Sequence, residues 1–365
     1  EVFMGNLDIT NKIFLMVLIT FLTSTLLMPF IKRIAIQVNA LDIPRGRHIH
    51  KTPTPKLGGL GIFLSFLLGY MIFGEPSSQM NSILIGSFII IITGIIDDIV
   101  ELKAFTKFIG QLIASLVITV YGQILLSNID AFGIYLEFGI FTYPLTIFFI
   151  LGCINCINLI DGLDGLSGGI SSIYFLTIGI ISTIQGKFGL DFILTFTMFG
   201  STLGFLVHNF HPASIFAGDT GSMFMGFIIS VIALLGFKNI TLTSLVIPLL
   251  VLAIPILDTI FAIVRRTLKG ESIAKADKFH IHHQLLNRSF SQTKTVLIIY
   301  FINILFAIAS IVYVLKDKVL GYVVYSILLL IVIIFVLKTN VVIDHDIAIS
   351  KIKNKITKIK NKKNK

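Results

Sequence analysis

The segment 155–169, which reads Asn-Cys-Ile-Asn-Leu-Ile-Asp-Gly-Leu-Asp-Gly-Leu-Ser-Gly-Gly, ends an apolar run with amides, carboxylates and glycines. Asp161 and Asp164 are three residues apart, and Asn158 lies three before Asp161, so on a helix end their side chains share one face. Such a group could bind Mg²⁺ through one or two carboxylates or hydrogen-bond a polar ligand. Gly162 and the glycines after it would let the backbone approach that ligand closely. The alternative is a polar helix cap, which needs only one aspartate.

Two further acidic motifs have a spacing suited to metal or phosphate chemistry. Asp219 lies in the sequence Phe216-Ala-Gly-Asp-Thr-Gly-Ser, before a helix that we expect to begin near Ser222. A carboxylate there could hold a metal ion whose other ligands are substrate phosphates, or it could simply cap the helix. Asp97 and Asp98 are adjacent, so in a helix their side chains point about 100° apart. We expect one to face the site and the other to pair with a lysine; the alternative is an ordinary acidic helix end.

A histidine-rich segment follows the acidic motifs in the chain. It contains three histidines, His280, His282 and His283. The cations that precede it are Arg265, Arg266, Lys275 and Lys278. Zinc would be expected to recruit cysteine or a tight histidine pair on a helix, whereas a cationic segment suits an anionic ligand. We therefore favour contact with phosphate or pyrophosphate, and a structural loop and a metal site remain alternatives. Lys51 would add to the same positive potential.

The composition indicates that these motifs belong to an integral membrane protein. Apolar residues make up 55% of the 365 residues and charged residues only 13%, whereas a soluble domain has about 25% charged residues. The mean hydropathy is +0.95. A helix needs about 20 apolar residues to cross the hydrocarbon core of a membrane. We therefore predict an all-α polytopic integral membrane protein with about eleven transmembrane helices, at about 11–31, 58–74, 82–96, 105–121, 144–160, 170–185, 191–207, 222–236, 241–263, 294–314 and 319–337.

The distribution of lysine and arginine orients these helices, because cytoplasmic loops carry an excess of both. With the N-terminus outside, the outer loops hold only Lys187, Lys238, Lys316 and Lys318. The C-terminus is then cytoplasmic, in agreement with an odd number of spans, and every acidic or histidine motif lies on the cytoplasmic face. Alternating residues at 132–141 suggest a small outer hairpin. Residues 1–337 would form a single domain, and the lysine-rich tail 338–365 is either a solvated extension or a contact for anionic lipids.

Acids that can hold Mg²⁺, bases that can hold phosphates and a membrane location together imply a reaction between a nucleotide-type substrate and a lipid phosphate. Two other classes fit less well. An intramembrane aspartyl protease has a Gly-x-Gly-Asp motif, whereas Asp219 follows Phe-Ala-Gly. An ion-coupled transporter has its acids near the middle of the bilayer, often at broken helices, and only Asp258 lies well inside a predicted span. A buried pairing or helix contact explains Asp258 more simply.

Four motifs closely resemble those of the polyprenyl-phosphate N-acetylhexosamine-1-phosphate transferases, the superfamily of the MraY and WecA/TagO types. The motifs are Asp97-Asp98, Asn158-Leu-Ile-Asp-Gly-Leu-Asp-Gly-Leu, Phe216-Ala-Gly-Asp-Thr-Gly-Ser and His280-Ile-His-His. They follow one another in the order of the superfamily. The eleven spans, the cytoplasmic C-terminus and the His-Ile-His-His sequence resemble the WecA/TagO branch, since the MraY type has three consecutive histidines.

The resemblance implies a Mg²⁺-dependent enzyme of the bacterial plasma membrane, with Mn²⁺ as a substitute ion and an active site on the cytoplasmic face. It would transfer GlcNAc-1-phosphate from UDP-GlcNAc to undecaprenyl phosphate, giving undecaprenyl-pyrophosphate-GlcNAc and UMP. This is the first membrane step of a cell-envelope polymer such as teichoic acid or O-antigen. UDP-MurNAc-pentapeptide is the alternative donor. We expect no nucleic acid partner, and a homodimer stays open.

By motif position, the resemblance makes Asp219 a metal ligand with Asp98 as a second, and Asp97 or Asp98 the acid that activates the acceptor. The implied nucleotide pocket consists of Asn158, Asp161, Gly162, Asp164, Asn209 and Phe216, of which Phe216 could stack on uracil. The histidine segment, in the positive field of Arg265 and Arg266, would recognise the phosphates or the sugar. Lys51 matches a basic position of the superfamily only approximately, because Lys56 is a rival. Direct displacement and a covalent phospho-aspartate intermediate both stay open.

Overall fold

The computed structural model describes residues 8–43, 53–131, 134–238, 252–268, 280–315 and 318–337. Lys51 and the predicted tail 338–365 lie outside these residues. The described chain is helical apart from two short hairpins, in agreement with the predicted fold class. Its longer helices are α1 (Ile9–Gln37), α2 (Gly58–Phe73), α3 (Ser78–Val100), α4 (Ala104–Leu116), α5 (Thr142–Ile160), α6 (Leu166–Ile184), α7 (Leu190–Asn209), α8 (Gly218–Lys238), α10 (Ala253–Leu268), α12 (Gln292–Leu315) and α13 (Lys318–Leu337). A short helix, α11 (Ile281–Asn287), precedes α12, a π-helical turn (Val117–Tyr121) continues α4, and a 3-10 turn (Gly139–Phe141) leads into α5.

The protein is a polytopic membrane protein. Among the described residues, eight helices are long and apolar enough to cross a membrane, and shorter apolar helices occupy Gly58–Phe73 and Val319–Ile334. These ten segments coincide with ten of the predicted spans. The remaining predicted span, 241–263, lies partly outside the described residues, and α10 forms its second half. The total of eleven spans therefore stays a prediction.

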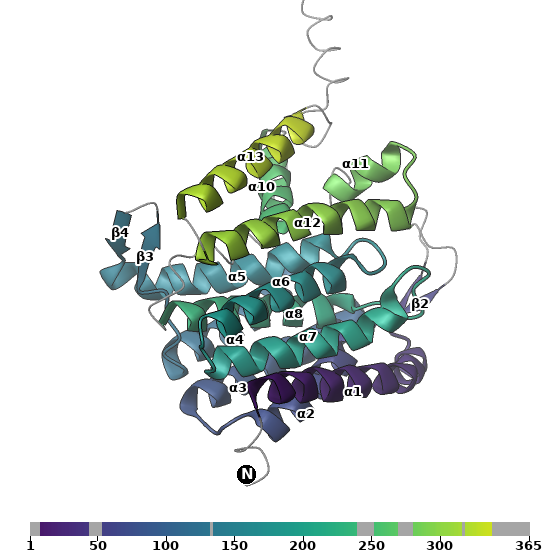
Figure 1. Ribbon diagram of the computed structural model, residues 1–365. Coiled ribbons are helices and arrows are strands. Elements are labelled where there is room, and N and C mark those ends of the chain that lie inside the picture. Colours follow the sequence, from purple (N-terminus) through teal and green to yellow (C-terminus); the bar gives the residue numbers. More distant parts are fainter. Residues whose placement is uncertain are drawn as a thin grey trace, which may run out of the picture.

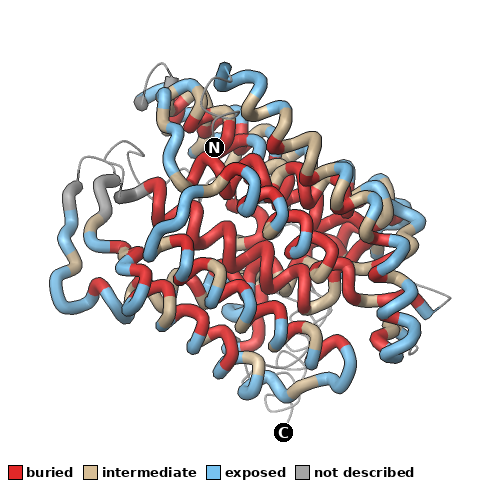
Figure 2. The backbone as a smooth tube through the Cα atoms, turned by 90° about the horizontal axis from the view of Figure 1, so that it is seen from below, coloured by how far each residue is buried: buried red, intermediate tan, exposed pale blue. Residues whose placement is uncertain are grey.

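Helix α8 forms the centre of the bundle and packs against α3 and α5. In the most apolar 18-residue stretch of this helix, 89% of the residues are buried. Figure 2 shows buried residues through the middle of the molecule with exposed residues around them. Gly94 lets α3 approach α8, because a Cβ there would lie 2.4 Å from the Cα of Thr220, and small residues allow helix backbones to come close. Exposed apolar side chains such as Phe14 and Phe148 cover the outside, as expected of a surface that faces lipid. The close approach brings the last turn of α3 beside the first turn of α8.

The two hairpins lie toward opposite ends of the bundle (Figure 1). Strand β3 (Asn128–Ala131) pairs antiparallel with β4 (Ile134–Glu137), so a hairpin exists where one was predicted, but it begins at Asn128 rather than at 132. At the other end, β1 (Leu41–Asp42) pairs antiparallel with β2 (Thr54–Pro55), a hairpin that we did not predict. Strand β2 lies at the same end as α11 (Figure 1). All the motifs that could carry chemistry reach this second end.

The local structure at this end differs from our expectations at three places. Helix α8 begins at Gly218 rather than near Ser222, so Asp219 lies within its first turn. Helix α5 ends at Ile160, so the predicted helical face shared by Asp161 and Asp164 is wrong. The predicted span 144–160 ends at the same residue, and the glycine-rich sequence after Ile160 explains why the helix does not continue over the two aspartates, because glycine is unfavourable inside a helix. The histidine segment, expected as a loop, contains the short helix α11.

Candidate active site

A cavity of about 320 Å³ opens where the ends of α3, α5, α7 and α8 meet β2 and α11. Its lining brings together most of the residues that we predicted from the sequence: Asp98, Asn158, Asp161, Gly162, Asp164, Asn209, Phe216, Asp219 and His283. Four further residues, Asp42, Lys56, Leu163 and Gly218, also line it, and of these only Lys56 was considered from the sequence, as the rival of Lys51. The lining of the cavity is mostly polar, although the cavity lies at the end of a bundle of apolar helices. Such a site is suited to a charged or hydroxyl-rich ligand.

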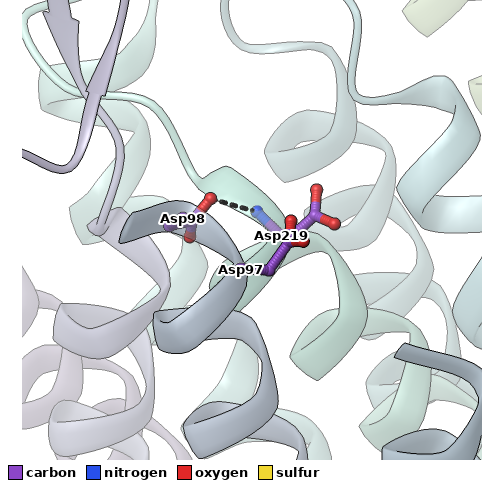
Figure 3. Close-up of side chains that lie close together, drawn as sticks. All are labelled: Asp97, Asp98 and Asp219. Carbon is purple, nitrogen blue, oxygen red and sulfur yellow. Dashed lines mark hydrogen bonds between the residues drawn. The ribbon is translucent and has the colours of Figure 1, made fainter. Parts of the chain in front are cut away.

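Three aspartates from two helices form an acidic cluster at the edge of this cavity (Figure 3). Asp97 and Asp98 come from the last turn of α3, and Asp219 comes from the first turn of α8. One carboxylate oxygen from each lies within 4.8 Å of the other two, and both α3 aspartates are buried. Carboxylate oxygens are the ligands that Mg²⁺ prefers. The cluster could therefore hold a metal ion.

Asp98 caps the N-terminus of α8 from the neighbouring helix. Its Oδ1 accepts a hydrogen bond from the backbone N–H of Asp219 at 3.0 Å (Figure 3). Its Oδ2 accepts from the backbone N–H of Thr220 at 3.1 Å and from the hydroxyl of Thr220 at 2.7 Å. The first N–H groups of a helix have no acceptor within the helix, and the carboxylate of Asp98 is the acceptor for two of them in α8. Gly218 makes room, because its φ is +68° and a Cβ there would lie 2.3 Å from Oδ2 of Asp98.

The side chain of Asp219 is consequently not the cap of α8, and it points to two other polar groups. Its Oδ1 accepts a hydrogen bond from Nδ2 of Asn158 at 3.1 Å, and its Oδ2 pairs with the ammonium of Lys107. The same ammonium lies 2.8 Å from Oδ2 of Asp97. Lys107 therefore bridges two of the three aspartates, and our expectation that one of the adjacent aspartates pairs with a lysine is confirmed for Asp97.

Lys107 is the main residue that reasoning from the sequence missed. The available signal was its position, because it follows Asp98 by nine residues and lies in the first turn of the next apolar helix. A lysine at that position could be predicted to turn back toward the acidic end of α3.

The turn after α5 carries Asp161 at the C-cap of the helix. The hydroxyl of Ser167 donates a hydrogen bond to Oδ1 of Asp161. Removal from bulk water, helped by the negative charges of Asp219 and Asp164, raises the pKa of Asp161 to about 7 against the opposing effect of Ser167. At neutral pH, Asp161 can therefore donate or accept a hydrogen bond.

Asp164 and Asn209 join this turn to the loop between α7 and α8. Oδ2 of the buried Asp164 lies 2.7 Å from Nδ1 of His211 and accepts the backbone N–H of Ala213 at 3.1 Å. Asn209 accepts the N–H of Gly165 at 3.0 Å through Oδ1 and donates to the carbonyl of Ile215 at 2.9 Å through Nδ2. Both side chains line the cavity while they fix its walls.

The β1–β2 hairpin closes the cavity on the side of Phe216. The N–H of Phe216 donates to the carbonyl of Pro55 at 2.8 Å, and its carbonyl accepts from the N–H of Gly58 at 2.9 Å. This pairing brings Lys56 into the lining. Of the two rival lysines in the sequence, Lys56 is thus a cavity residue, whereas Lys51 lies outside the described residues.

The three histidines of the segment occupy different positions. His283 lines the cavity. His282 is buried against Gly162, where a Cβ would lie 2.6 Å from Nε2 of the imidazole. Burial, followed by the charge of His283, lowers the pKa of His282 to about 3, so this imidazole is neutral at physiological pH. His280 is directed at Asp258, with Nδ1 and Oδ2 2.7 Å apart.

Two predicted cations are buried outside the cavity lining. Arg265 and Arg266 are in the last turn of α10, where both are buried. Neither is part of the cavity lining formed by the described residues. Their contribution to an anionic ligand would therefore be electrostatic rather than by direct contact.

Stability should depend on pH through Asp161, because its pKa of about 7 lies above the ordinary value of 3.8. Between these values the folded protein keeps a proton that the unfolded chain releases, so stability falls as the pH rises toward 7. An asparagine cannot ionise. We expect Asp161→Asn to raise the melting temperature relative to wild type by more at about pH 8 than at about pH 5. Melting curves of both proteins in detergent measure this, and a pH-independent difference contradicts the raised pKa.

Comparison with known proteins identifies the family of this chain. Residues 80–237, which run from α3 to α8, match the model of glycosyl transferase family 4. A probable undecaprenyl-phosphate N-acetylglucosaminyl 1-phosphate transferase of Bacillus subtilis is 41% identical over 302 residues, covering 81% of this chain and 83% of the relative. The chain belongs to glycosyl transferase family 4.

Two other relatives in glycosyl transferase family 4 are more distant. A decaprenyl-phosphate N-acetylglucosaminephosphotransferase of Mycobacterium tuberculosis is 32% identical over 301 residues, covering 74% of each chain. An undecaprenyl-phosphate alpha-N-acetylglucosaminyl 1-phosphate transferase of Escherichia coli is 28% identical over 288 residues, covering 76% of this chain and 78% of the relative. Membership of the family confirms the resemblance that the four motifs indicated.

Proposed function

We propose that the protein transfers GlcNAc-1-phosphate from UDP-GlcNAc to undecaprenyl phosphate, giving undecaprenyl-pyrophosphate-GlcNAc and UMP. One observation carries this proposal: a single cavity at one end of a membrane bundle joins the aspartate cluster to Lys56, His283 and Phe216. The names of the relatives from B. subtilis and E. coli support the same reaction. The lipid product would begin a cell-envelope polymer of the teichoic acid or O-antigen type.

The donor nucleotide occupies the part of the cavity that Phe216, Asn158 and Asp161 line. Both the N–H and the carbonyl of Phe216 are hydrogen-bonded, so the backbone that carries its ring is held in place. The ring can then stack on uracil, a contact worth about 1–3 kcal/mol. The pyrophosphate and sugar extend toward His283 and Lys56. His282 supports this part of the cavity wall from its buried position against Gly162, where its pKa of about 3 keeps the imidazole uncharged.

The acceptor reacts by direct displacement. An oxygen of the lipid phosphate attacks the β-phosphorus of UDP-GlcNAc, and the bond from that phosphorus to the bridging oxygen breaks, so the electron pair leaves with UMP. A phosphate monoester has a second pKa of about 6, so most of it is dianionic at neutral pH and needs no strong base. Lys107 and Asp97 orient the acceptor, while Asp98 keeps the N-terminus of α8 in place beside the reacting groups.

Asp219, together with Asp98 or Asp97, would hold Mg²⁺, for which Mn²⁺ could substitute. Three carboxylates within 4.8 Å provide the oxygen ligands that this ion prefers, and the ammonium of Lys107 already lies between two of them. When bound, the ion neutralises charge on the pyrophosphate and on the leaving UMP.

The direct test is an assay of UMP release. Purified protein is incubated with Mg²⁺, undecaprenyl phosphate and one UDP-sugar at a time. We expect UMP release with UDP-GlcNAc and little with UDP-MurNAc-pentapeptide. A preference for the pentapeptide donor would overturn the proposed substrate, although membership of the family would stand.

The proposed topology has eleven spans, an outer N-terminus and a cytoplasmic C-terminus in the bacterial plasma membrane. The β3–β4 hairpin and the cavity then lie on opposite membrane faces. This agrees with Figure 1, in which β3 and β4 lie at the opposite end of the bundle from β2 and α11, the elements beside the cavity. A reporter inserted at Ala131 should read outside and one fused after Lys365 should read cytoplasmic. A cytoplasmic signal at Ala131 would contradict this arrangement. Contact of the tail 338–365 with anionic lipids and a homodimer stay predictions.

A further inference from the structure

We propose that Asp258 is a positioning residue that holds the histidine segment against the donor side of the cavity. The inference rests on the proposed function, because it assumes that the histidines face the donor. Asp258 lies in the apolar helix α10 and is 3% exposed. A carboxylate in such surroundings is costly unless it is fully hydrogen-bonded. Its partners therefore indicate what it is for.

Both carboxylate oxygens of Asp258 bind the start of α11. Oδ1 accepts a hydrogen bond from the backbone N–H of Ile281 at 2.8 Å, and Oδ2 lies 2.7 Å from Nδ1 of His280. Ile281 is the first residue of α11 and His280 is its N-cap, whose own side chain makes no capping hydrogen bond. The first N–H groups of a helix need partners from outside it. Asp258 thus anchors both the backbone of α11 and the imidazole that precedes it.

The anchored end of α11 carries His282 and His283, of which His283 lines the cavity. The ring of His280 stacks parallel to that of His282, with centroids 5.7 Å apart and an interplanar angle of 1°. The ring of His282 lies 4.3 Å from that of His283. His282 touches Gly162, and His283 lines the cavity. A continuous row of contacts therefore runs from Asp258 to the cavity wall.

The chemistry of the pair explains how Asp258 acts. An ionised carboxylate only accepts hydrogen bonds, so Nδ1 of His280 carries the hydrogen and the ring orientation is fixed. Carboxylates that orient a histidine in this way at metal sites typically matter by a factor of about 10–100. A displacement of about 1 Å at a reacting group can cost about 10²-fold in rate. Loss of the hydrogen bonds of Asp258 should therefore displace His283 and so weaken its contact with the donor.

Asp258→Asn separates the two anchoring contacts. The amide oxygen can still accept the N–H of Ile281, whereas the amide nitrogen is a donor, so His280 can keep the contact only by moving its hydrogen from Nδ1 to Nε2. We expect kcat/KM for UDP-GlcNAc to fall about 10–100-fold, while the KM for undecaprenyl phosphate and the melting temperature stay near wild type. Asp191→Asn is the matched control, because Asp191 is also buried in a helix but lies about 27 Å along α7 from Asn209.

His280 provides a second pair of variants that does not alter the buried carboxylate. Asparagine can place its Nδ2 near the position of Nδ1 of histidine and donate to Asp258, whereas alanine cannot. We expect His280→Ala to match Asp258→Asn, and His280→Asn to recover most of the loss. Because Asp258 acts through His280, the double variant Asp258→Asn with His280→Ala should be no worse than the worse single variant.

Three results would overturn the inference: a wild-type kcat/KM in folded Asp258→Asn, an equal loss in Asp191→Asn, or additive losses in the double variant. Failure of the proposed function gives a different result, since wild-type protein would then release no UMP from UDP-GlcNAc. If the wild type uses another UDP-sugar, the same set of variants measured with that donor decides the role of Asp258.

Discussion

Asp219→Asn should reduce UMP release from UDP-GlcNAc by about 10²–10³-fold, because an electrostatic group that acts in the transition state is often worth this much. Asparagine keeps the size of the side chain and can still accept from Asn158. It loses the negative charge that pairs with Lys107 and that would hold Mg²⁺. Steady-state rates at saturating donor and acceptor measure the effect. Excess EDTA should abolish activity of the wild-type protein, and added Mg²⁺ or Mn²⁺ should restore it.

Asp191→Asn is the control for this change as well. Asp191 and Asp219 both lie in the first turn of a helix, so a general effect of neutralising a helix N-terminus would appear in both. Loss of a capping interaction costs about 1 kcal/mol of stability and spares the rate of the folded enzyme. A folded Asp219→Asn protein with a wild-type rate, or full UMP release in EDTA, would remove Asp219 from the proposed metal site.

Lys107→Met should lower kcat by about 10²-fold and, in addition, lower the Mg²⁺ concentration needed for half-maximal rate. Its ammonium lies between Asp97 and Asp219, where it both neutralises two carboxylates and competes with a metal ion for them. Methionine keeps the length and apolar stem of lysine but has no charge. A titration of the rate with Mg²⁺ measures both effects in one experiment.

Lys103→Met tests whether the effect is specific. Lys103 precedes the same helix by one residue and is exposed, so its removal changes the net charge equally without touching the cluster. We expect a rate within about twofold of wild type, since exposed charges contribute little at physiological ionic strength. If both variants behaved alike, the lysine would act only through the general potential of the cytoplasmic face.

The sequence by itself determined the class of protein, the order of the motifs and most of the cavity lining. Long apolar segments can satisfy their backbone hydrogen bonds in a membrane only as helices or closed barrels, so the helical class followed from composition. Polar residues such as Asp98, Asn158 and Asp219 stand out in that background, because ionisable groups at a membrane are costly and are usually functional. Their types and spacing were enough to indicate phosphate and metal chemistry.

Only the tertiary structure decided which of these residues contact one another and what each contact does. Asp98 and Asp219 are 121 residues apart in the chain, and no local pattern could predict that the first caps the helix of the second. The same holds for Lys107, which turns back to two aspartates from the neighbouring helix, and for Lys56, which the pairing of β1 with β2 brings to the cavity. Asp258 and His280 meet across 22 residues. Hydrogen bonds and ion pairs between helices depend on packing, which periodicity along one helix does not encode.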